Sequence, residues 1–152
     1  MREVYKIIAS ALIFSKDNKL LMWRKYPTAW WIYTDCWHIP WGSVNEWESL
    51  KDAVIREIKE EIWLDISDSK IILLPYWDSL VSEKTLKESW EKVLCHMEVS
   101  RFKISINKNA SDIVLQLTDN LIEIKWFNLE ELSNIKHAPL GKKFLQKMWC
   151  IK

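Results

Sequence analysis

The sequence predicts an α+β fold in which one mixed β-sheet packs against a small number of helices. Runs of apolar and β-branched residues lie on both sides of one amphipathic helical pattern, and a second helical pattern ends the chain. Strands and helices therefore do not alternate as they would in a doubly wound fold. The 152 residues are 49% apolar, which is enough for one core, so we expect a single domain over residues 1–152.

The N-terminal elements are predicted by their composition. Residues 4–14 are rich in apolar and β-branched side chains, residues 15–18 read Ser-Lys-Asp-Asn and predict a turn, and residues 19–24 predict the second strand of a β-hairpin. Residues 27–35 predict a loop. Residues 36–40 predict a short strand that leads toward the first helix.

The first helix is predicted to begin after Ser49 and to end near Ile62. Ser49 and Asp52 have the spacing of a capping box, in which the Ser side chain accepts a hydrogen bond from the first turn. Four apolar residues at i,i+4 spacing form the stripe expected to face the sheet: Leu50, Val54, Ile58 and Ile62.

The C-terminal half is predicted to return to the sheet. Residues 70–75 and 92–106 read as strands, and the second is long enough to bend or to contain a bulge. Residues 78–91 between them are polar and are predicted to be exposed. The remaining predicted elements are a strand at residues 121–127, a short helix at residues 129–132 capped by Asn128, and a terminal helix at residues 140–148.

Charge and cysteine content argue against several classes of protein. The formal net charge is +1 with both signs interspersed, so no nucleic-acid polymer is expected as a partner. This charge does not argue against small phosphorylated ligands. Cys36, Cys95 and Cys150 show neither CxxC spacing nor an even disulfide framework, which favours reduced thiols in a cytoplasmic protein. No apolar run approaches the roughly 18 residues of a membrane span, so no membrane association is expected.

Four ionisable groups crowd into less than two turns of the first helix, at Arg56, Glu57, Glu60 and Glu61. At about 100° per residue, Glu57 and Glu61 fall within roughly 20° of Leu50, so two carboxylates lie on the apolar edge of the helix. Burial of an ionised carboxylate is costly, and like charges at i,i+4 repel each other. A divalent cation would remove both penalties, and hard cations favour carboxylate oxygens.

Residues 42–64 resemble the Nudix box, the signature of hydrolases that cleave nucleoside diphosphates linked to another moiety. The family pattern is Gly, five residues, Glu, seven residues, and then Arg-Glu-apolar-x-Glu-Glu-x-Gly-apolar. The chain departs from this pattern at Trp63, which stands where the family has Gly. The matching positions are Gly42, Glu48, Arg56, Glu57, Ile58, Glu60, Glu61 and Leu64.

The resemblance implies an α/β/α sandwich whose catalytic helix packs against the mixed sheet. It also implies that Mg²⁺ or Mn²⁺ is held by Glu57, Glu60, Glu61 and the carbonyl of Gly42. The bound metal would polarise a phosphoryl oxygen and lower the pKa of a water molecule, so that the water attacks a diphosphate near neutral pH.

The expected catalytic set is Glu60, Glu57 and Arg56. We favour Glu60 as the general base, although members of the family differ in this assignment. By resemblance, Arg56 pairs with Glu48 and holds the loop against the helix; the alternative is a weak surface ion pair. Glu123 precedes Trp126 by three residues on a predicted strand, where some family members carry an additional acid, and the alternative there is a solvent-facing strand residue.

The resemblance therefore predicts a pyrophosphatase that hydrolyses a phosphoanhydride bond in a nucleoside di- or triphosphate or in a nucleotide-linked substrate. One alternative is a non-catalytic nucleotide-sensing domain of the same fold, against which the complete glutamate cluster argues. A less favoured alternative is an enzyme like isopentenyl-diphosphate isomerase, which needs a Cys, a Glu and His metal ligands that have no evident positions here. The resemblance leaves open which nucleotide is the substrate and allows a homodimer.

Trp is unusually frequent in this chain and Gly unusually rare, as if one had replaced the other. The chain has 11 Trp and 2 Gly, while about 7% of residues are Gly in an ordinary protein. Trp63 ends the predicted helix, where a left-handed residue is wanted and Gly is favoured. Trp41 and Trp47 lie in the predicted loop before the helix, at positions where family members usually carry Gly. The indoles at these positions are expected to obstruct the phosphate path and to strain the helix end.

One hypothesis is that many Trp are Gly in the native protein, because its source reads UGA as Gly and the gene was translated with UGA as Trp. The alternative is a protein that is Trp-rich as written. The best candidates for Gly are Trp41, Trp47 and Trp63, and weaker ones are Trp23, Trp30, Trp31, Trp77, Trp90 and Trp149. Trp37 and Trp126 fit apolar strand patterns and resemble family aromatics, so both are expected to be authentic.

Overall fold

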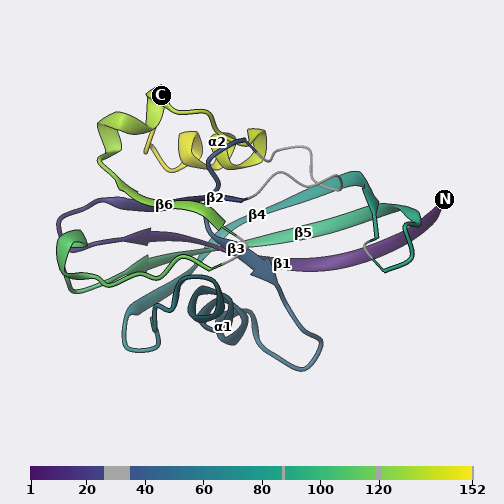
Figure 1. Cartoon of the computed structure of the whole chain (residues 1–152), viewed down its shortest axis with the longest axis horizontal. Coiled ribbons are helices and arrows are strands. Elements are labelled where there is room, and N and C mark those ends of the chain that lie inside the picture. The colour runs from purple at the N-terminus through teal and green to yellow at the C-terminus, as the bar shows by residue number, and fades with distance from the viewer. Residues whose placement is uncertain (26–34, 87, 119–120, 152) are drawn as a thin grey trace.

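A mixed β-sheet lies between two helices in the computed structural model, which describes residues 1–25, 35–86, 88–118 and 121–151 (Figure 1). The strands are β1 (Arg2–Phe14), β2 (Leu20–Lys25), β3 (Trp41–Ser43), β4 (Lys70–Thr85), β5 (Lys92–Ser105) and β6 (Leu121–Phe127). The helices are α1 (Leu50–Ile62) and α2 (Pro139–Lys147), with 3₁₀ turns η1 (Ala110–Asp112) and η2 (Leu129–Asn134). The α+β fold with α/β/α layering is therefore confirmed.

Strand β1 organises the sheet, whose order is β4-β5-β1-β2-β6 with β3 also paired to β1. It runs parallel to β5 along its whole length. Residues 8–10 pair with β3 in the antiparallel sense, and Phe14 pairs with Leu20 of β2. The predicted N-terminal hairpin is thus present, although most of β1 pairs with other strands.

The alternating side chains of β1 contribute to both faces of the sheet. Ala11 and Ile13 are buried in one cluster with Ile58 of α1. Leu12 is buried in a second cluster with Phe144 of α2. The two helices therefore cover opposite faces, as Figure 1 shows. Among the described residues, neither helix has the length and apolar character needed to cross a bilayer.

Helix α1 has the boundaries that its sequence predicts. The Ser49 hydroxyl accepts a hydrogen bond from the backbone N–H of Asp52 at 3.1 Å, which caps the first turn. The last turn ends at Trp63, whose backbone N–H donates to the carbonyl of Lys59 at 3.0 Å. The buried residues of the helix are Ala53, Val54, Ile58 and Ile62.

The prediction of an exposed connection at residues 78–91 is wrong, because β4 continues to Thr85 and pairs with β5 along this stretch. Exposed and half-buried residues alternate there, as in a strand with one solvent-facing side, and the polar residues on that side concealed the strand pattern. The register shift lies in β4, between Leu73 and Trp77. The length of residues 92–106 predicts a bend or a bulge in that strand, and the irregularity lies in its partner instead.

The predicted strand at residues 36–40 is also wrong. His38 and Trp37 form only isolated bridges, to Trp23 and His137 respectively, and the paired strand is β3 (Trp41–Ser43) instead. Trp41 therefore lies in a strand rather than in the expected loop. Most of the loop predicted at residues 27–35, with Trp30 and Trp31, falls outside the described residues.

Three Trp residues adopt a backbone conformation that favours Gly. Among the described non-Gly residues, positive φ angles occur at Asn18 (61°), Trp63 (60°), Trp90 (57°) and Trp149 (63°). This left-handed conformation costs a residue with a Cβ about 1–2 kcal/mol. The indoles at 63, 90 and 149 are 66%, 68% and 93% exposed, so packing offsets little of this cost. These angles support the hypothesis of Gly at these three positions, and a UGG codon for Trp63 would contradict it there.

We expect Trp63→Gly to raise the free energy of unfolding by about 1 kcal/mol, because Gly adopts the left-handed C-cap without steric cost. For a domain of this size, the corresponding rise in Tm is about 2–4 °C. Thermal unfolding of the two full-length chains measures it. Trp47→Gly is the matched control, since Trp47 is 79% exposed but is not among the residues with positive φ, and no gain is expected there. Equal Tm values for Trp63→Gly and the parent chain would contradict the strain.

Candidate active site

The backbone of β3 touches the helix that carries the glutamates. A Cβ at residue 42 would lie 2.7 Å from Cβ of Glu57 and closer still to its Cγ and Cδ, so no side chain fits there. Real Cβ atoms do not approach other atoms this closely, and replacement of Gly42 would push β3 and α1 apart. The contact therefore places the Gly42 backbone directly against the Glu57 side chain.

Arg56 fastens the loop between β3 and α1 to the helix. Its Nε and Nη2 atoms donate to the two carboxylate oxygens of Glu48 at 3.0 and 2.6 Å. Nη2 also donates to the carbonyl of Ser43, and Glu48 accepts from the backbone N–H of Asn45, both at 2.9 Å. The hydrogen bonds from Arg56 and Asn45 hold the pKa of Glu48 below its ordinary value. This two-pronged pair fixes the loop more firmly than a single ion pair would.

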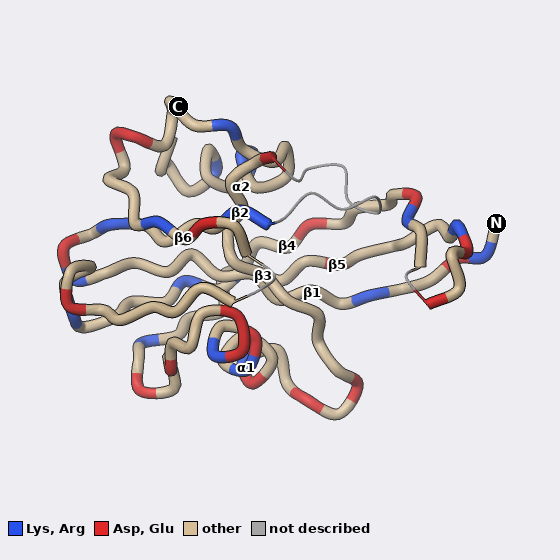
Figure 2. Tube along the Cα trace, in the orientation of Figure 1, with Lys and Arg blue, Asp and Glu red and all other residues tan. Residues whose placement is uncertain are grey.

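The remaining N–H donors of Arg56 face the glutamate cluster. Nη1 donates to Glu57 at 3.0 Å and to Glu60 at 3.2 Å. The Glu57 side chain is only 18% exposed, whereas that of Glu60 is 59% exposed. Figure 2 shows acidic and basic residues gathered together on α1 beside the sheet. Glu60 is therefore the glutamate of this pair that is open to solvent.

Glu57 and Glu61 lie on the apolar edge of α1, as the helical spacing predicts, and both are half-buried. Burial raises the pKa of Glu57, the hydrogen bond and charge of Arg56 oppose this rise, and the charges of Glu60 and Glu61 add to it. Oε2 of Glu61 is buried and has no hydrogen-bond partner among the described residues. At least one buried carboxylate oxygen of this cluster therefore lacks a hydrogen-bond donor among the described residues.

Lys25, at the end of β2, also lies near this cluster, and no motif in the sequence singles it out. Burial lowers its pKa, and the charges of Glu61 and Glu57 oppose that effect. Its Nζ lies 4.3 Å from the centroid of the Trp41 ring. A lysine at the end of a strand is common and does not indicate a functional role. The fold brings this lysine close to Trp41 of β3 and within electrostatic range of Glu57 and Glu61.

The donor set fits a hard divalent cation. The buried, unpaired Glu61 oxygen and the close Gly42 backbone offer the carboxylate and carbonyl oxygens that Mg²⁺ and Mn²⁺ prefer. As placed, with Arg56 bonded to Glu57 and Glu60, no three His, Cys, Asp or Glu side chains within the described ranges are grouped closely enough to hold a metal ion.

The other candidates from the sequence lie apart from this cluster or have other partners. Glu123 on β6 forms an ion pair with Arg24 on β2 at 2.7 Å, and its side chain is 43% exposed. Cys36 and Cys95 are both buried, and burial raises the pKa of Cys36. Burial of this kind is typical of packing thiols and gives no support to the isomerase alternative.

A pocket of about 90 Å³ lies on the other face of the sheet, where α2 begins. Trp41 lines it together with Arg101 and Leu140. Because successive strand residues point to opposite faces, Trp41 faces this pocket while Gly42 faces Glu57. Strand β3 thus lies between the pocket and the glutamate cluster.

Residues 4–148 match the family model of the NUDIX domain. The chain belongs to the Nudix family. The RNA pyrophosphohydrolase of Hydrogenovibrio crunogenus is 37% identical over 68 residues, which are 45% of this chain and 38% of that protein. The RNA pyrophosphohydrolase of Wolbachia pipientis is 20% identical over 146 residues, which are 95% of this chain and 86% of that protein. The match to the Hydrogenovibrio protein thus spans well under half of its length.

Solved structures share the fold. The E. coli dihydroneopterin triphosphate pyrophosphohydrolase aligns with a TM-score of 0.70 at 17% identity, covering 95% of this chain and 96% of that one. The NUDIX domain of Shewanella oneidensis NrtR, complexed with ADP ribose, aligns with a TM-score of 0.63 at 14% identity, covering 95% and 86%. At these identities the likeness shows the common Nudix fold.

Glu57→Gln is expected to stabilise the metal-free protein at neutral pH. Because burial raises the pKa of Glu57 above its ordinary value of 4.5 in the folded state, the folded protein binds this proton more tightly than the unfolded chain does. The free energy of unfolding therefore falls as pH rises from about 4.5 through the folded pKa. The substitution removes this loss, and urea denaturation at pH 4.5 and pH 8 with a chelator present measures it.

The control for this measurement is Glu130→Gln, which changes an exposed carboxylate in η2. We expect no gain in stability at pH 8 from this control. A Glu57→Gln chain less stable than the parent at pH 8 would contradict the desolvation of Glu57.

Proposed function

We propose that the protein is a metal-dependent pyrophosphohydrolase that cleaves a phosphoanhydride bond in a nucleotide or nucleotide-linked substrate. The observation that carries this proposal is the pair of half-buried carboxylates, Glu57 against the backbone of Gly42 and Glu61 with a buried oxygen that has no hydrogen-bond partner among the described residues. The family and the relatives named as pyrophosphohydrolases support the same chemistry. The products would be two phosphorylated compounds, or a nucleoside monophosphate and pyrophosphate.

In this proposal Glu57, Glu60, Glu61 and the Gly42 carbonyl hold Mg²⁺ or Mn²⁺. A bound cation would supply a Lewis acid for a phosphoryl oxygen and a water of lowered pKa. Glu60, the exposed member of the cluster, accepts the proton of the attacking water. Lys25 attracts the phosphate groups toward the cluster, since its ammonium lies partly buried beside Glu57 and Glu61.

The substrate class includes nucleoside triphosphates, nucleotide sugars and similar small molecules in the cytoplasm. The 5′ end of an RNA is a second candidate, favoured by the relatives named RNA pyrophosphohydrolase. The net charge of +1 gives the chain little overall attraction for a long polyanion. A nucleotide-sensing domain is the non-catalytic alternative, and the NUDIX domain complexed with ADP ribose shows that this fold accommodates such a ligand.

Glu60→Gln should lower kcat by about 10²-fold or more, because the amide accepts no proton from water. Its exposed position predicts little change in Tm. Hydrolysis is followed by chromatography of the products with Mg²⁺ present, on nucleoside triphosphates, ADP-ribose and a short 5′-triphosphorylated RNA. The Glu130→Gln chain is the matched control and should keep the parent rate.

An unchanged rate for Glu60→Gln would remove this residue from the mechanism. Saturable binding without hydrolysis of any compound would favour the sensing alternative. The same assay includes a chain with Trp41, Trp47 and Trp63 replaced by Gly, in which we expect faster hydrolysis. Equal rates in the written and replaced chains would contradict the steric effect of the three indoles.

A further inference from the structure

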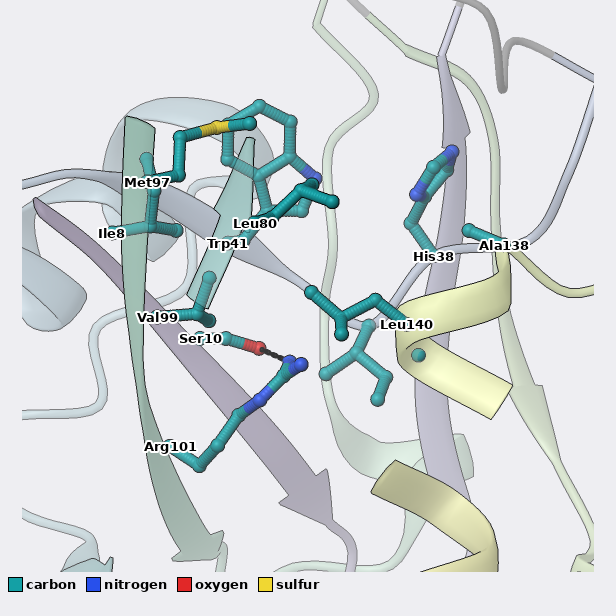
Figure 3. A pocket seen from close by; sticks show the side chains of 12 residues that line it. Ile8, Ser10, His38, Trp41, Leu80, Met97, Val99, Arg101, Ala138 and Leu140 are labelled. Atoms are coloured by element: carbon teal, nitrogen blue, oxygen red, sulfur yellow. Dashed lines mark hydrogen bonds between the residues drawn. The ribbon is translucent and has the colours of Figure 1, made fainter. Parts of the chain in front are cut away.

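The pocket at the start of α2 has mostly apolar walls and contains the buried guanidinium of Arg101 (Figure 3). Its aliphatic lining comes from Ile8, Leu80, Met97, Val99 and Leu140. Three buried polar residues also line it, namely Ser10, His38 and Arg101, and Arg101 of β5 is only 4% exposed. Figure 3 shows Arg101 and Trp41 at opposite ends of the pocket. A ligand that enters beside Trp41 would therefore meet Arg101 with its inner edge.

The positive charge of the Arg101 guanidinium is balanced by one carboxylate, that of Asp78. Its Nε and Nη2 atoms lie 3.4 and 3.1 Å from Oδ2 of Asp78 on β4, and Nη1 donates to the Ser10 hydroxyl at 2.9 Å. Its central carbon lies 4.6 Å from the centroid of the Phe144 ring. The hydrogen bonds formed with described residues engage three of the five N–H groups of a guanidinium, which leaves one on each terminal nitrogen. Buried donors of this kind gain most from an acceptor on a ligand.

We propose that this pocket takes the base of the nucleotide and that Arg101 selects a purine whose inner edge carries two acceptors. Guanine presents O6 and N7, which pair with the two N–H donors of an arginine. Adenine presents an amino donor at position 6, which would face Arg101 and leave a buried donor unpaired. The inference rests on the nucleotide substrate of the proposed function.

The pocket and the glutamate cluster lie on opposite sides of β3. Trp41 lines the pocket, and its neighbour Gly42 lies against Glu57 on the other side of β3. The ammonium of Lys25 lies over the Trp41 ring and is attracted by Glu57 and Glu61. In this proposal, a base seated against Arg101 extends the attached phosphates past Lys25 toward the carboxylates.

Trp41 limits the size of this pocket. Small-molecule pockets usually have volumes of about 300–1,000 Å³. The volume of about 90 Å³ found here is well below that range. Trp41→Gly removes the indole from the pocket, and the side chains that surround Arg101 stay in place. The test is therefore made in the full-length chain that carries Trp41→Gly.

The experiment is calorimetric titration with non-hydrolysable guanosine and adenosine triphosphate analogues in the presence of Mg²⁺. With Arg101 intact, the guanosine analogue should bind about tenfold more tightly than the adenosine analogue. An inosine analogue, which has O6 and N7 but no 2-amino group, should bind like the guanosine one. Arg101→Gln should reverse the preference, since the Gln amide pairs with N6 and N7 of adenine.

Two further variants separate specificity from folding. Arg2→Gln changes an exposed arginine of β1 whose partner is Glu91, and it should leave the preference unchanged. Arg101→Gln combined with Asp78→Asn removes the unpaired carboxylate, so that a reversed preference is measurable even if Arg101→Gln alone fails to fold. Thermal unfolding of each chain reports which variants are folded.

Equal affinity for the two analogues, a guanosine preference that survives Arg101→Gln, or no binding of either analogue would overturn the inference. Hydrolysis of nucleotides without regard to the base would keep the proposed function and overturn the role of Arg101. Guanosine-selective binding that depends on Arg101, without hydrolysis of any nucleotide, would support the pocket assignment and contradict the proposed activity.

Discussion

The lack of room for a side chain at residue 42 is the constraint on which the site depends. Gly42 lets the backbone of β3 lie against Glu57, and this contact removes the carboxylate from solvent. Arg56 then fixes the adjoining loop through Glu48 and partly neutralises the glutamates. The result is a cluster whose negative charges are only partly neutralised and which a bound cation would complete. Without a cation, this cluster lowers the stability of the protein. Such a trade-off between stability and function is common at functional sites.

The alternation of side chains along a strand places two different environments next to each other. Residue 41 faces an apolar pocket bounded by α2, while residue 42 faces the charged cluster of α1. Lys25 lies between them, beside the Trp41 ring and near Glu61. A molecule with an aromatic end and an anionic end matches this arrangement. Its aromatic end would lie in the apolar pocket on one side of β3, and its anionic end would lie near Lys25 and a bound cation on the other.

Elements with a clear capping residue or a clear apolar periodicity were predictable from the sequence. The Ser49 cap and the apolar stripe predicted α1, and the same spacing predicted that Glu57 and Glu61 lie at its buried edge. The far end of β4 was not predictable, because its polar face resembles a loop until β5 supplies the pairing strand. Lys25 and Arg101 were missed for a related reason, since their burial arises from strands distant in the sequence.

The central claim is that the carboxylates at the Gly42 contact bind a divalent cation. Titration of the full-length chain with Mn²⁺, followed by electron paramagnetic resonance of the free ion, tests this claim without any substrate. We predict saturable binding that is lost or weakened at least about tenfold by Glu57→Gln and is unchanged by Glu130→Gln, since direct carboxylate ligands dominate affinity for hard cations. Absence of saturable binding, or equal binding by the Glu57→Gln chain, would contradict the account.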